Sequence, residues 1–398
     1  MKFYCLYDLI EHRRREIGQT EQEMFNFFRH EKVKKAELLF YKNNCSVEQA
    51  DYILPAIEKY TGLSKLEIYL SIGIVPEEYK DNFFKNIHLI SKILEKDQIK
   101  KENIKLELKP FFETKLGVLY NDDCIEVLSQ IPDKSVDLVF ADPPFNLNKI
   151  YDEGINDCHS MTEYLEWCFK WIEECIRILK RGGALFVYNI PKWSIFFSDY
   201  LNKRMTLRSW IAIDMKLSFP IKGRLYPSHY GLLYYIKGDK PNTFNTQRMP
   251  IQTCRHCGGE IKDYGGYKKK MNPNGVNISD VWTDIYPVRH KKQKNRAFNE
   301  LSVKMLDRVI SMTTNPGDVV FDPFGGSGTT YVVSELLERK WIGSELGNCN
   351  IIEERFKTIQ KDKELLQKIY EDKNTIFSRK SRVLRSQDGF WLDDNIKS

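Results

Sequence analysis

Short apolar runs alternate with helical segments from Leu116 onward, and this alternation restricts the fold more than any other feature of the sequence. Such alternation is typical of parallel α/β sheets, because each helix returns the chain to start the next strand in the same direction. We expect strands at Gly117–Tyr120, Val136–Ala141, Ala184–Tyr188, Ser209–Met215, Tyr230–Ile236, Val319–Phe321 and Trp341–Ser344. We expect helices at Ile125–Gln130, Met161–Lys180, Ile195–Asn202, Glu300–Met312 and Thr329–Arg339. The pattern predicts a doubly wound α/β sheet.

Residues 1–90 lack this alternation, and their pattern predicts a small all-α domain. Helical apolar spacing runs through Leu6–Ile17, Thr20–His30 and Ser46–Thr61, and capping-box patterns begin at Ser46 and Ser64. The order resembles helix-turn-helix domains of the phage-repressor kind, with the first helix of the motif opening near Thr20. The alternative is a helical cap or dimerisation domain. Residues 91–115 predict a Lys/Glu-rich linker.

Charge is distributed unevenly along the chain. The whole chain has a net charge of +6, but residues 201–300 hold 19 basic and 7 acidic side chains, a balance of +12. Within this window, residues 240–298 are rich in Gly, Asn, Lys and Tyr and break the α/β rhythm, which indicates an irregular insertion. A basic insertion in an otherwise acidic chain is expected where a polyanion binds.

The first chemical motif is Asp142-Pro143-Pro144-Phe145, directly after the predicted strand Val136–Ala141. Two prolines cannot continue the hydrogen bonding of a sheet, so the chain leaves the sheet at this point. The point is the carboxyl end of the strand, and open α/β sheets bind ligands at the carboxyl ends of their strands. The Asp142 carboxylate and the Pro143 carbonyl can accept both hydrogens of a planar amine while the Phe145 ring stacks on it. An ordinary loop is the alternative for so short a motif.

The second motif extends from Asp322 to Thr330, between a predicted strand and a predicted helix. Its glycines allow a ligand to approach the backbone closely, and the helix start supplies unpaired N–H donors. Glu345, at the end of the next strand, can accept hydrogen bonds from two ribose hydroxyls. No lysine follows Gly328, so the loop does not match the motif that binds nucleoside triphosphates.

Taken together and in this order, the two motifs resemble those of the β-class DNA amino-methyltransferases, which use S-adenosyl-L-methionine. In that family the catalytic motif precedes the cofactor motif, and a target-recognition region lies between them. Tyr120–Cys124 resembles the family's acidic turn, and Ile131–Asp137 resembles its lead-in to the catalytic strand. The resemblance covers residues 116–358 and implies a Rossmann-like methyltransferase sheet, with an irregular target-recognition insertion.

The resemblance also implies the parts of the chain and the roles of residues. Residues 116–239 would form the catalytic part, 240–298 the target-recognition insertion and 299–374 the cofactor-binding part, and the tail 375–398 receives no role. The catalytic motif would be Asp142, Pro143, Pro144 and Phe145. Asp123 would contact the adenine of the cofactor, and Asp322 would contact its methionine amino group. The other residues expected to bind the cofactor are Cys124, Phe324, Gly326, Gly328, Thr329 and Glu345. The chain departs from the family in having Phe145 where most members have Tyr, and Asn295–Ser302 where many have a His-Pro…Lys-Pro segment.

The expected reaction is methyl transfer to the N6 amino group of adenine in duplex DNA. Family members with Asp at the first motif position mostly methylate adenine, whereas cytosine-N4 enzymes mostly have Ser there. Cytosine-N4 methylation is the alternative, since both amines meet the same geometry. A DNA-binding regulator with a non-catalytic, cofactor-sensing domain is the alternative from another class.

Two features of the insertion suggest further contacts. Cys254 and Cys257 resemble one half of a zinc ribbon, which His256, His290 or another chain would have to complete. The alternative is a pair of structural thiols. We expect phosphate contacts from Lys268, Lys269, Lys270, Arg289, Lys291 and Lys292. The alternative for these basic runs is a solvated surface.

The cysteines are scattered and odd in number, and neither an apolar leader nor an uncharged run of about 18 apolar residues is present. We therefore expect an intracellular protein that does not act at a membrane. The family resemblance further implies a cytoplasmic protein of a prokaryote or phage that acts at the nucleoid. Its expected partners are duplex DNA, a second copy of the chain and a cognate restriction nuclease.

Overall fold

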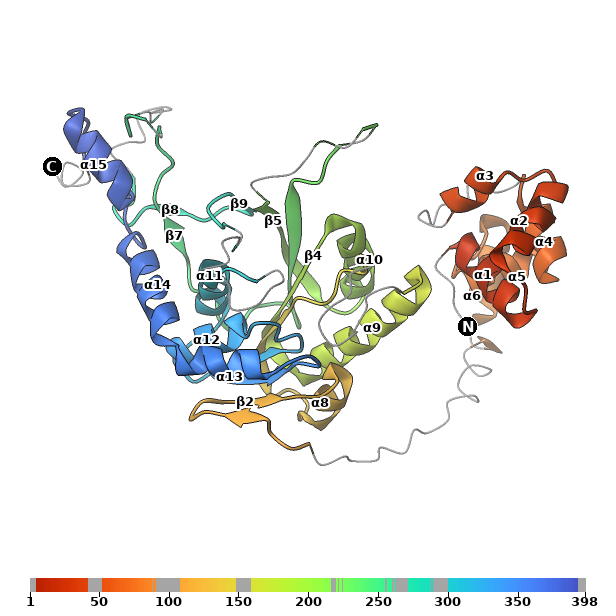
Figure 1. Cartoon of the computed structure of the whole chain (residues 1–398), viewed down its shortest axis with the longest axis horizontal. Coiled ribbons are helices and arrows are strands. Elements are labelled where there is room, and N and C mark those ends of the chain that lie inside the picture. Colours follow the sequence, from red (N-terminus) through yellow and green to blue (C-terminus); the bar gives the residue numbers. More distant parts are fainter. Residues whose placement is uncertain are drawn as a thin grey trace. The chain divides into compact units, whose positions relative to one another are not determined.

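The computed structural model describes residues 5–41, 52–87, 89–90, 108–147, 159–215, 220, 222–223, 225–254, 256–259, 261, 271–286, 288 and 300–392 (Figure 1). The chain divides into two compact units. One comprises Met1–Lys105 and Cys158–Cys168, and the other comprises Leu106–Asp157 and Phe169–Ser398. Each unit has a hydrophobic core of its own.

The N-terminal unit is helical throughout the regular structure of its described residues, as predicted. Its helices are α1 (Leu6–Glu16), α2 (Glu21–His30), α3 (Lys35–Phe40), α4 (Leu54–Thr61), α5 (Lys65–Ser71) and α6 (Glu77–Lys85). Their apolar faces meet around fully buried side chains such as Met24, Phe28 and Ile57. Burying one such side chain contributes about 1.5–3 kcal/mol, so the shared core stabilises helices too short to persist alone.

Helices α2 and α5 begin with capping boxes. The Ser64 hydroxyl accepts the backbone N–H of Glu67, and the Glu67 carboxylate accepts the backbone N–H of Ser64. Thr20 and Glu23 form the same pair at the start of α2. The predicted starts at Thr20 and Ser64 are confirmed, whereas the pattern at 46–49 lies outside the described residues.

Helix α9 (Met161–Ile178) has its first residues in the N-terminal unit and the rest in the second unit. Within the N-terminal unit, Thr162 donates its hydroxyl to the Asp8 carboxylate, and Arg15 lies 3.6 Å from Glu163. Burial raises the pKa of Asp8 above its usual value. The start of α9 therefore packs on α1.

Within its described residues, the second unit contains a nine-stranded sheet and a two-stranded sheet. In space, the strands of the large sheet follow the order β1, β2, β11, β10, β3, β4, β6, β5, β9. These strands are β1 (Phe112–Glu113), β2 (Gly117–Tyr120), β3 (Val136–Ala141), β4 (Leu179–Asn189), β5 (Thr206–Asp214), β6 (His229–Ile236), β9 (Val281–Trp282), β10 (Val319–Asp322) and β11 (Lys340–Ser344).

The five neighbouring strands from β2 to β4 are parallel, whereas β6 is antiparallel to both β4 and β5. From β3 the chain proceeds through α9 to β4 on one side, and from β10 it proceeds through α12 to β11 on the other side. The winding reverses between β3 and β10, so the predicted doubly wound, Rossmann-like α/β sheet is confirmed. Such a reversal is where open α/β sheets bind ligands, at the carboxyl ends of the strands.

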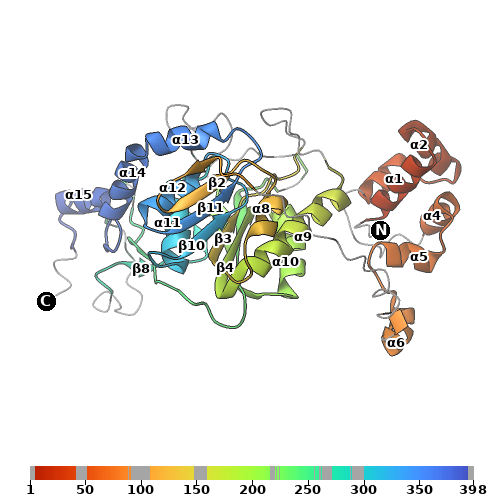
Figure 2. The same cartoon turned by 90° about the horizontal axis from the view of Figure 1, so that it is seen from below.

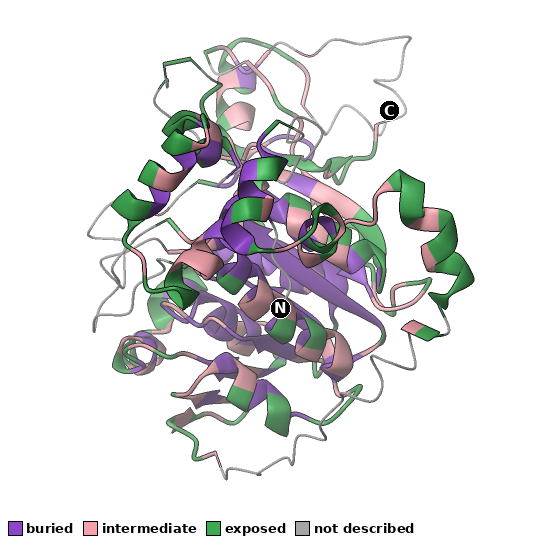
Figure 3. Cartoon of the chain, turned by 90° about the vertical axis from the view of Figure 1, so that its right-hand side faces the viewer, coloured by how far each residue is buried: buried purple, intermediate pink, exposed green. Residues whose placement is uncertain are grey.

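Helices cover both faces of this sheet, with α8, α9 and α10 on one face and α11 and α12 on the other (Figure 2). The helices besides α9 are α8 (Cys124–Gln130), α10 (Pro191–Asn202), α11 (Val303–Thr313), α12 (Thr329–Leu336), α13 (Asn350–Lys357), α14 (Gln360–Glu371) and α15 (Arg379–Gln387). Leu138 and Phe140 of β3 pack with Leu306 and Val309 of α11. The central strands are buried between helices whose outer faces are exposed (Figure 3).

Strand β4 begins at Leu179 and not at the predicted Ala184. Leu179 is opposite Val136 of β3, but Ala184 is opposite Leu138, so the residues between them form a bulge. Gly182 lies in this bulge with a φ of +79°, a conformation that favours glycine. The extra pairing depends on β3, which is distant in the sequence, so the local pattern does not reveal it.

The segment 240–298 is irregular over most of its described residues, as expected. Strand β7 (Arg248–Met249) pairs with β8 (Val276–Asn277) to form the two-stranded sheet. Strand β9 instead joins the large sheet parallel to β5, and the Trp282 side chain is fully buried there. The end of the predicted insertion is therefore anchored in the main core.

The C-terminal residues, for which the sequence suggested no role, form helix α15 and pack on the predicted insertion. Ile251 donates its backbone N–H to the carbonyl of Ile376 at 2.9 Å, which joins the two segments. Within the described part of the chain, no helix is long and apolar enough to cross a lipid bilayer.

Candidate active site

The two predicted motifs meet at one edge of the sheet. Asp142 directly follows β3, and Asp322 is the last residue of β10. These strands are parallel neighbours, with Phe321 opposite Val139. The structure therefore places side by side two carboxylates that lie far apart in the sequence, at the point where the winding reverses.

The Asp142–Phe145 turn is held by helix α10. Pro143 is buried, and Asp142 and Phe145 are half-buried. The carbonyl oxygen of Phe145 accepts a hydrogen bond from the indole N–H of Trp193 at 2.7 Å, and Trp193 is 1% exposed. Asn146 then takes a φ of +51°, which carries the chain away from the sheet. Trp193 is not among the residues predicted from the sequence, because an aromatic residue in a helix is typical of a core position.

Three aromatic rings surround the end of this turn. The ring centroid of Phe145 lies 6.1 Å from that of Tyr188 and 6.0 Å from that of Tyr230, and the two tyrosine rings are 5.0 Å apart. Burial, and then the negative charge of Asp142, raise the pKa of Tyr188 above its usual range. Asp142 thus borders an aromatic group that could bind a flat ring.

The glycine loop is tied to the end of β11. The Glu345 carboxylate accepts the backbone N–H of Gly326 at 2.5 Å and that of Gly347 at 2.8 Å. Gly328 has a φ of +74°, and a Cβ there would come within 2.7 Å of Ile352. Helix α12 begins immediately after Gly328. Glycine at this position allows both the turn and the close contact with α13.

Arg355, which was not among the predicted site residues, holds the glycine loop by hydrogen bonds. Its guanidinium donates to the Thr329 hydroxyl at 2.7 Å and to the Ser327 carbonyl at 3.1 Å. It also forms ion pairs with Asp362 at 2.8 Å and Glu300 at 3.3 Å, with a side chain only 1% exposed. A buried arginine with this many partners fixes the loop relative to α13 and α14.

Asp322 is 1% exposed, and its carboxylate accepts the backbone N–H of Phe324 at 2.9 Å. Burial raises the pKa of Asp322 well above its usual range, and the charges of Asp142 and Glu345 add to this effect. Phe324 packs edge-on against Trp171, with ring centroids 5.2 Å apart. The loop thus presents a buried carboxylate that a cationic group would stabilise.

The predicted acidic turn lies beside Glu345. Strands β2 and β11 are parallel neighbours, and Asn121 donates its side-chain amide to the carbonyl of Glu345 at 2.8 Å. The Asp123 carboxylate accepts the backbone N–H of Ile125 at 2.8 Å and so caps helix α8. Cys124 is buried, which raises the pKa of its thiol. In the structure the Asp123 carboxylate therefore caps α8, and its contact with the cofactor stays a prediction.

A family model described as DNA methylase matches residues 136–354, which include both motifs and the segment between them. The chain belongs to this DNA methylase family. The structure places the family's motifs at neighbouring strand ends, as described above.

The methylase is similar to several known proteins. The type II methyltransferase M.BamHI of Bacillus amyloliquefaciens is 56% identical over 404 residues, covering 100% of this chain and 94% of that protein. The DNA adenine methyltransferase YhdJ of Escherichia coli (strain K12) is 31% identical over 60% of this chain and 81% of its own. Among solved structures, the PvuII DNA methyltransferase (cytosine-N4-specific) has a TM-score of 0.47 at 18% identity, covering 67% of this chain and 96% of that one.

S-adenosyl-L-methionine is the cofactor of this DNA methylase family, and the residues at the glycine loop fit it. The cofactor has a positively charged methionine amino group, a ribose diol and an adenine. The buried Asp322 carboxylate suits the cationic amino group, and the Glu345 carboxylate suits hydroxyl donors. Bound there, S-adenosyl-L-methionine supplies an electrophilic methyl group on its sulfonium.

The insertion of the methylase holds Cys254 and Cys257 in a tight turn. Gly258 donates its backbone N–H to the Cys254 carbonyl at 2.8 Å, and Gly259 donates to the Cys257 sulfur at 3.4 Å. Among the described residues, no group of three or more His, Cys, Asp or Glu side chains could hold a metal ion. Two thiols do not by themselves fit a tetrahedral zinc site, which needs four ligands.

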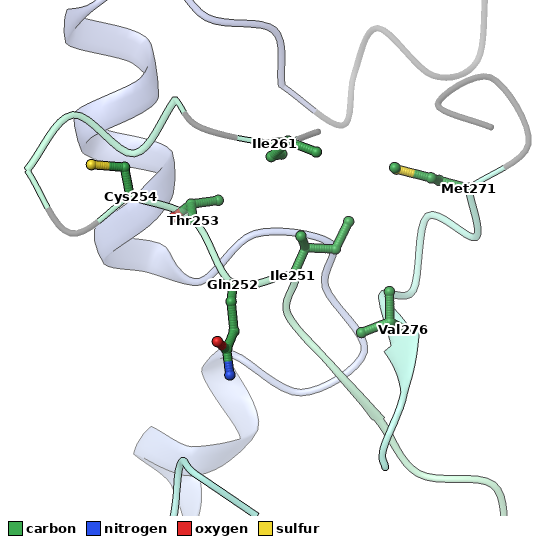
Figure 4. Close-up of a pocket in the computed structure, with 7 residues that line it drawn as sticks. All are labelled: Ile251, Gln252, Thr253, Cys254, Ile261, Met271 and Val276. Carbon is green, nitrogen blue, oxygen red and sulfur yellow. The ribbon is translucent and has the colours of Figure 1, made fainter. Parts of the chain in front are cut away.

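Beside this turn lies an open hollow of about 490 Å³ (Figure 4). Ile251, Met271 and Val276 line it together, and Cys254 lies at its side. The residues predicted to contact phosphates lie outside the described residues: Lys268, Lys269, Lys270, Arg289, Lys291 and Lys292.

Proposed function

We propose that the methylase transfers a methyl group from S-adenosyl-L-methionine to the exocyclic amino group of a base in duplex DNA, with the N6 of adenine as the expected target. One observation carries this proposal. The turn that begins with Asp142 and the glycine loop that begins with Asp322 end neighbouring parallel strands. A base held at the first motif and a cofactor held at the second would therefore lie next to each other.

The chemistry of an exocyclic amine explains why Asp142 and Pro143 are suited to hold it. Its lone pair is delocalised into the base, so the nitrogen is a poor nucleophile. Hydrogen bonds from its two hydrogens to the Asp142 carboxylate and the Pro143 carbonyl would favour tetrahedral nitrogen and direct the lone pair at the methyl group. Catalysis would then rest on positioning and electrostatics, without a covalent enzyme intermediate.

The target base must leave the duplex to reach Asp142, which costs a few kcal/mol of stacking and pairing. The aromatic group of Phe145, Tyr188 and Tyr230 can offset part of this cost by contact with the extruded ring. Phe145 lacks the hydroxyl of the tyrosine most common in the family, and it retains the face on which a base stacks.

On the cofactor side we propose the following contacts. Asp322 pairs with the methionine amino group, Glu345 accepts from the ribose hydroxyls, and Asp123 contacts the adenine. The remaining loop residues shape the backbone that receives the cofactor, and these are Cys124, Phe324, Gly326, Gly328 and Thr329. Support comes from the strands that precede or contain these residues. Asp123 comes shortly after β2, Glu345 directly follows β11, and Asp322 ends β10, and β11 pairs with both β2 and β10.

Adenine is supported by Asp142 and by the relative named a DNA adenine methyltransferase. Cytosine N4 is the second candidate, because the name of the matching DNA methylase family covers N6 and N4 methylation alike. Nucleoside mass spectrometry of unmethylated DNA incubated with the enzyme and deuterated-methyl cofactor separates the two. Labelled N6-methyladenine is the expected product, and labelled N4-methylcytosine would replace adenine in the proposal.

The same experiment tests the alternative of a non-catalytic regulator. Labelled methyl groups in DNA require an enzyme, whereas a regulator would bind DNA and cofactor without forming either product. We further propose that the methylase protects DNA within a restriction–modification system, because its relative M.BamHI is named a type II methyltransferase. DNA methylated by the enzyme should then resist one sequence-specific nuclease that cuts the unmethylated DNA.

A further inference from the structure

The C-terminal segment, residues 375–392, is fastened to the turn of the insertion that contains Cys254 and Cys257. The Ser381 and Thr253 hydroxyls are 2.8 Å apart and share a hydrogen bond. Arg385 donates to the carbonyl of Gly258 at 2.7 Å. Residues more than a hundred positions apart in the chain thus form one small structural element.

Arg385 is the anchor of this contact. Its side chain is fully buried, and its guanidinium lies 4.2 Å from the ring centroid of Phe377 and 4.9 Å from that of Trp391. It also donates two hydrogen bonds to the Trp391 carbonyl, at 3.0 and 2.8 Å. A buried arginine satisfied by carbonyls and aromatic faces fixes the orientation of helix α15.

The turn of the insertion is shaped to receive this helix. A Cβ at Gly258 would come within 3.0 Å of Leu384 and Arg385, and one at Gly259 would come within 2.2 Å of the Phe390 ring. Figure 4 shows Thr253 and Cys254 beside the same helix. Because both glycines are needed for this fit, the packing of α15 on the insertion is specific.

The outer face of α15 has a strongly positive charge. The helix has four basic residues and no acidic residue, and only Arg385 of the four is buried. The Arg379 side chain is 79% exposed, Lys380 is exposed and Arg382 is half-buried. Arg379 pairs with Glu371 at 3.1 Å, an exposed contact of the kind that is easily exchanged for another anion.

We propose that α15 is part of the surface by which the methylase holds DNA, with Arg379, Lys380 and Arg382 contacting backbone phosphates of the duplex. The proposal rests on the proposed function, since it extends the predicted target-recognition insertion by the helix docked on it. Flexible cations on one helix face suit phosphates, which contact such side chains without regard to sequence. The helix therefore adds affinity, and base recognition resides elsewhere.

The test is the salt dependence of DNA binding by R379Q/K380Q/R382Q. Each phosphate contact that is lost reduces the slope of log affinity against log salt by about 0.9. The triple variant should therefore bind a duplex containing the methylated site with a slope about two to three smaller in magnitude than wild type. K380Q alone should lower it by about one.

A matched control is R181Q/K203Q/K340Q, which removes three exposed cations that lie outside α15, near the amino-terminal ends of β4, β5 and β11. Arg181 is 83% exposed and pairs with Asp239 at 3.4 Å, much as Arg379 pairs with Glu371. The control has the same change in net charge, so it separates local contact from overall attraction. Its slope should equal that of wild type.

The outcomes distinguish this inference from the proposed function. If wild type methylates DNA and both triple variants show the same salt slope, α15 does not contact phosphates and the inference is overturned. If wild type methylates no DNA, the proposed function fails first. Equal affinity of all variants for S-adenosyl-L-methionine shows that each retains its fold.

Discussion

The indole N–H of Trp193 donates to the carbonyl oxygen of Phe145 at 2.7 Å. This bond joins α10 to the end of the turn that begins with Asp142, after two prolines that contribute no backbone donor. The position of Asp142 and Phe145 therefore depends on a buried residue that lies outside the motif. Trp193 is a positioning residue in this account.

We predict that W193F lowers kcat while leaving the affinity for S-adenosyl-L-methionine unchanged. Phenylalanine keeps most of the packing but leaves the Phe145 carbonyl without its indole partner. A displacement of about 1 Å in a reacting group can cost about a hundredfold in rate, so we expect a fall of about ten- to hundredfold. Steady-state kinetics with saturating DNA and cofactor measure it.

W341F is the matched control. Trp341 is also 1% exposed, and its indole N–H donates to Glu335 at 2.7 Å, away from the Asp142 turn. The two variants should lose similar stability, but only W193F should lose kcat. Equal kcat values for the two variants would show that the Trp193 bond has only a structural role.

Arg355 should control both stability and cofactor affinity. R355M leaves the Asp362 and Glu300 carboxylates buried without their partner, which typically costs about 3–5 kcal/mol in the free energy of unfolding. It also removes the donor to Thr329, so the loop should bind S-adenosyl-L-methionine more weakly. Urea denaturation and calorimetric titration measure the two effects.

R355K serves as the comparison for this variant. Lysine keeps the positive charge but lacks the planar set of N–H donors of arginine. R355K should therefore be more stable than R355M, with a smaller gain in cofactor affinity. Cofactor binding by folded R355M with wild-type affinity would contradict a role for Arg355 in holding the loop.

Glu345 should bind the cofactor through its charge. E345Q keeps the size of the side chain, but its amide group faces backbone N–H donors where the carboxylate accepted from Gly326 and Gly347. Hydrogen bonds to charged groups contribute about 1.5–3 kcal/mol, so we expect cofactor affinity to fall by about tenfold or more. E335Q, which changes a carboxylate bonded to Trp341, should keep the wild-type affinity. Unchanged affinity in E345Q would argue against the contact.

Asp284 should make stability depend on pH in a defined window. Burial would raise its pKa, but the hydrogen bonds and charge of Arg308, with that of Lys304, outweigh burial and hold the pKa at about 2, against 3.8 ordinarily. The ionised form is thus favoured by folding, and its stabilisation of about 2 kcal/mol is present above pH 4 and lost as the pH falls toward 2.

The measurement is the difference in free energy of unfolding between wild type and D284N across this window. The difference should be constant near neutral pH and shrink between pH 4 and pH 2. D239N changes an exposed partner of Arg181 and should show almost no difference at any pH. If the free energy of unfolding differs between wild type and D284N by the same amount at every pH, the ion pair adds no pH-dependent stability.

The sequence predicted those parts of the site that depend on local pattern. The strand before Asp142 and the glycine loop after Asp322 are recognisable because apolar runs, prolines and glycines act on their own neighbours. The pairing of the two strands that end in these motifs is seen only in the structure, since no local rule fixes which strands pair.

The parts that the sequence could not predict depend on distant partners. Arg355 and Arg385 are charged residues in polar helices, where exposure is the usual expectation, yet both are buried. Their partners come from other segments, including Thr329 for the first and Gly258 for the second. The same reason explains the bulge in β4 and the docking of β9 on β5.

The most direct test of the whole account is the rate of methyl transfer to DNA by D142A at saturating S-adenosyl-L-methionine. The Asp142 carboxylate is proposed to hold the amine, and removal of one such preorganised group typically costs about 10²–10³ in rate. We predict a loss at least this large, with cofactor affinity near that of wild type. A wild-type rate of methyl transfer by D142A would contradict the account.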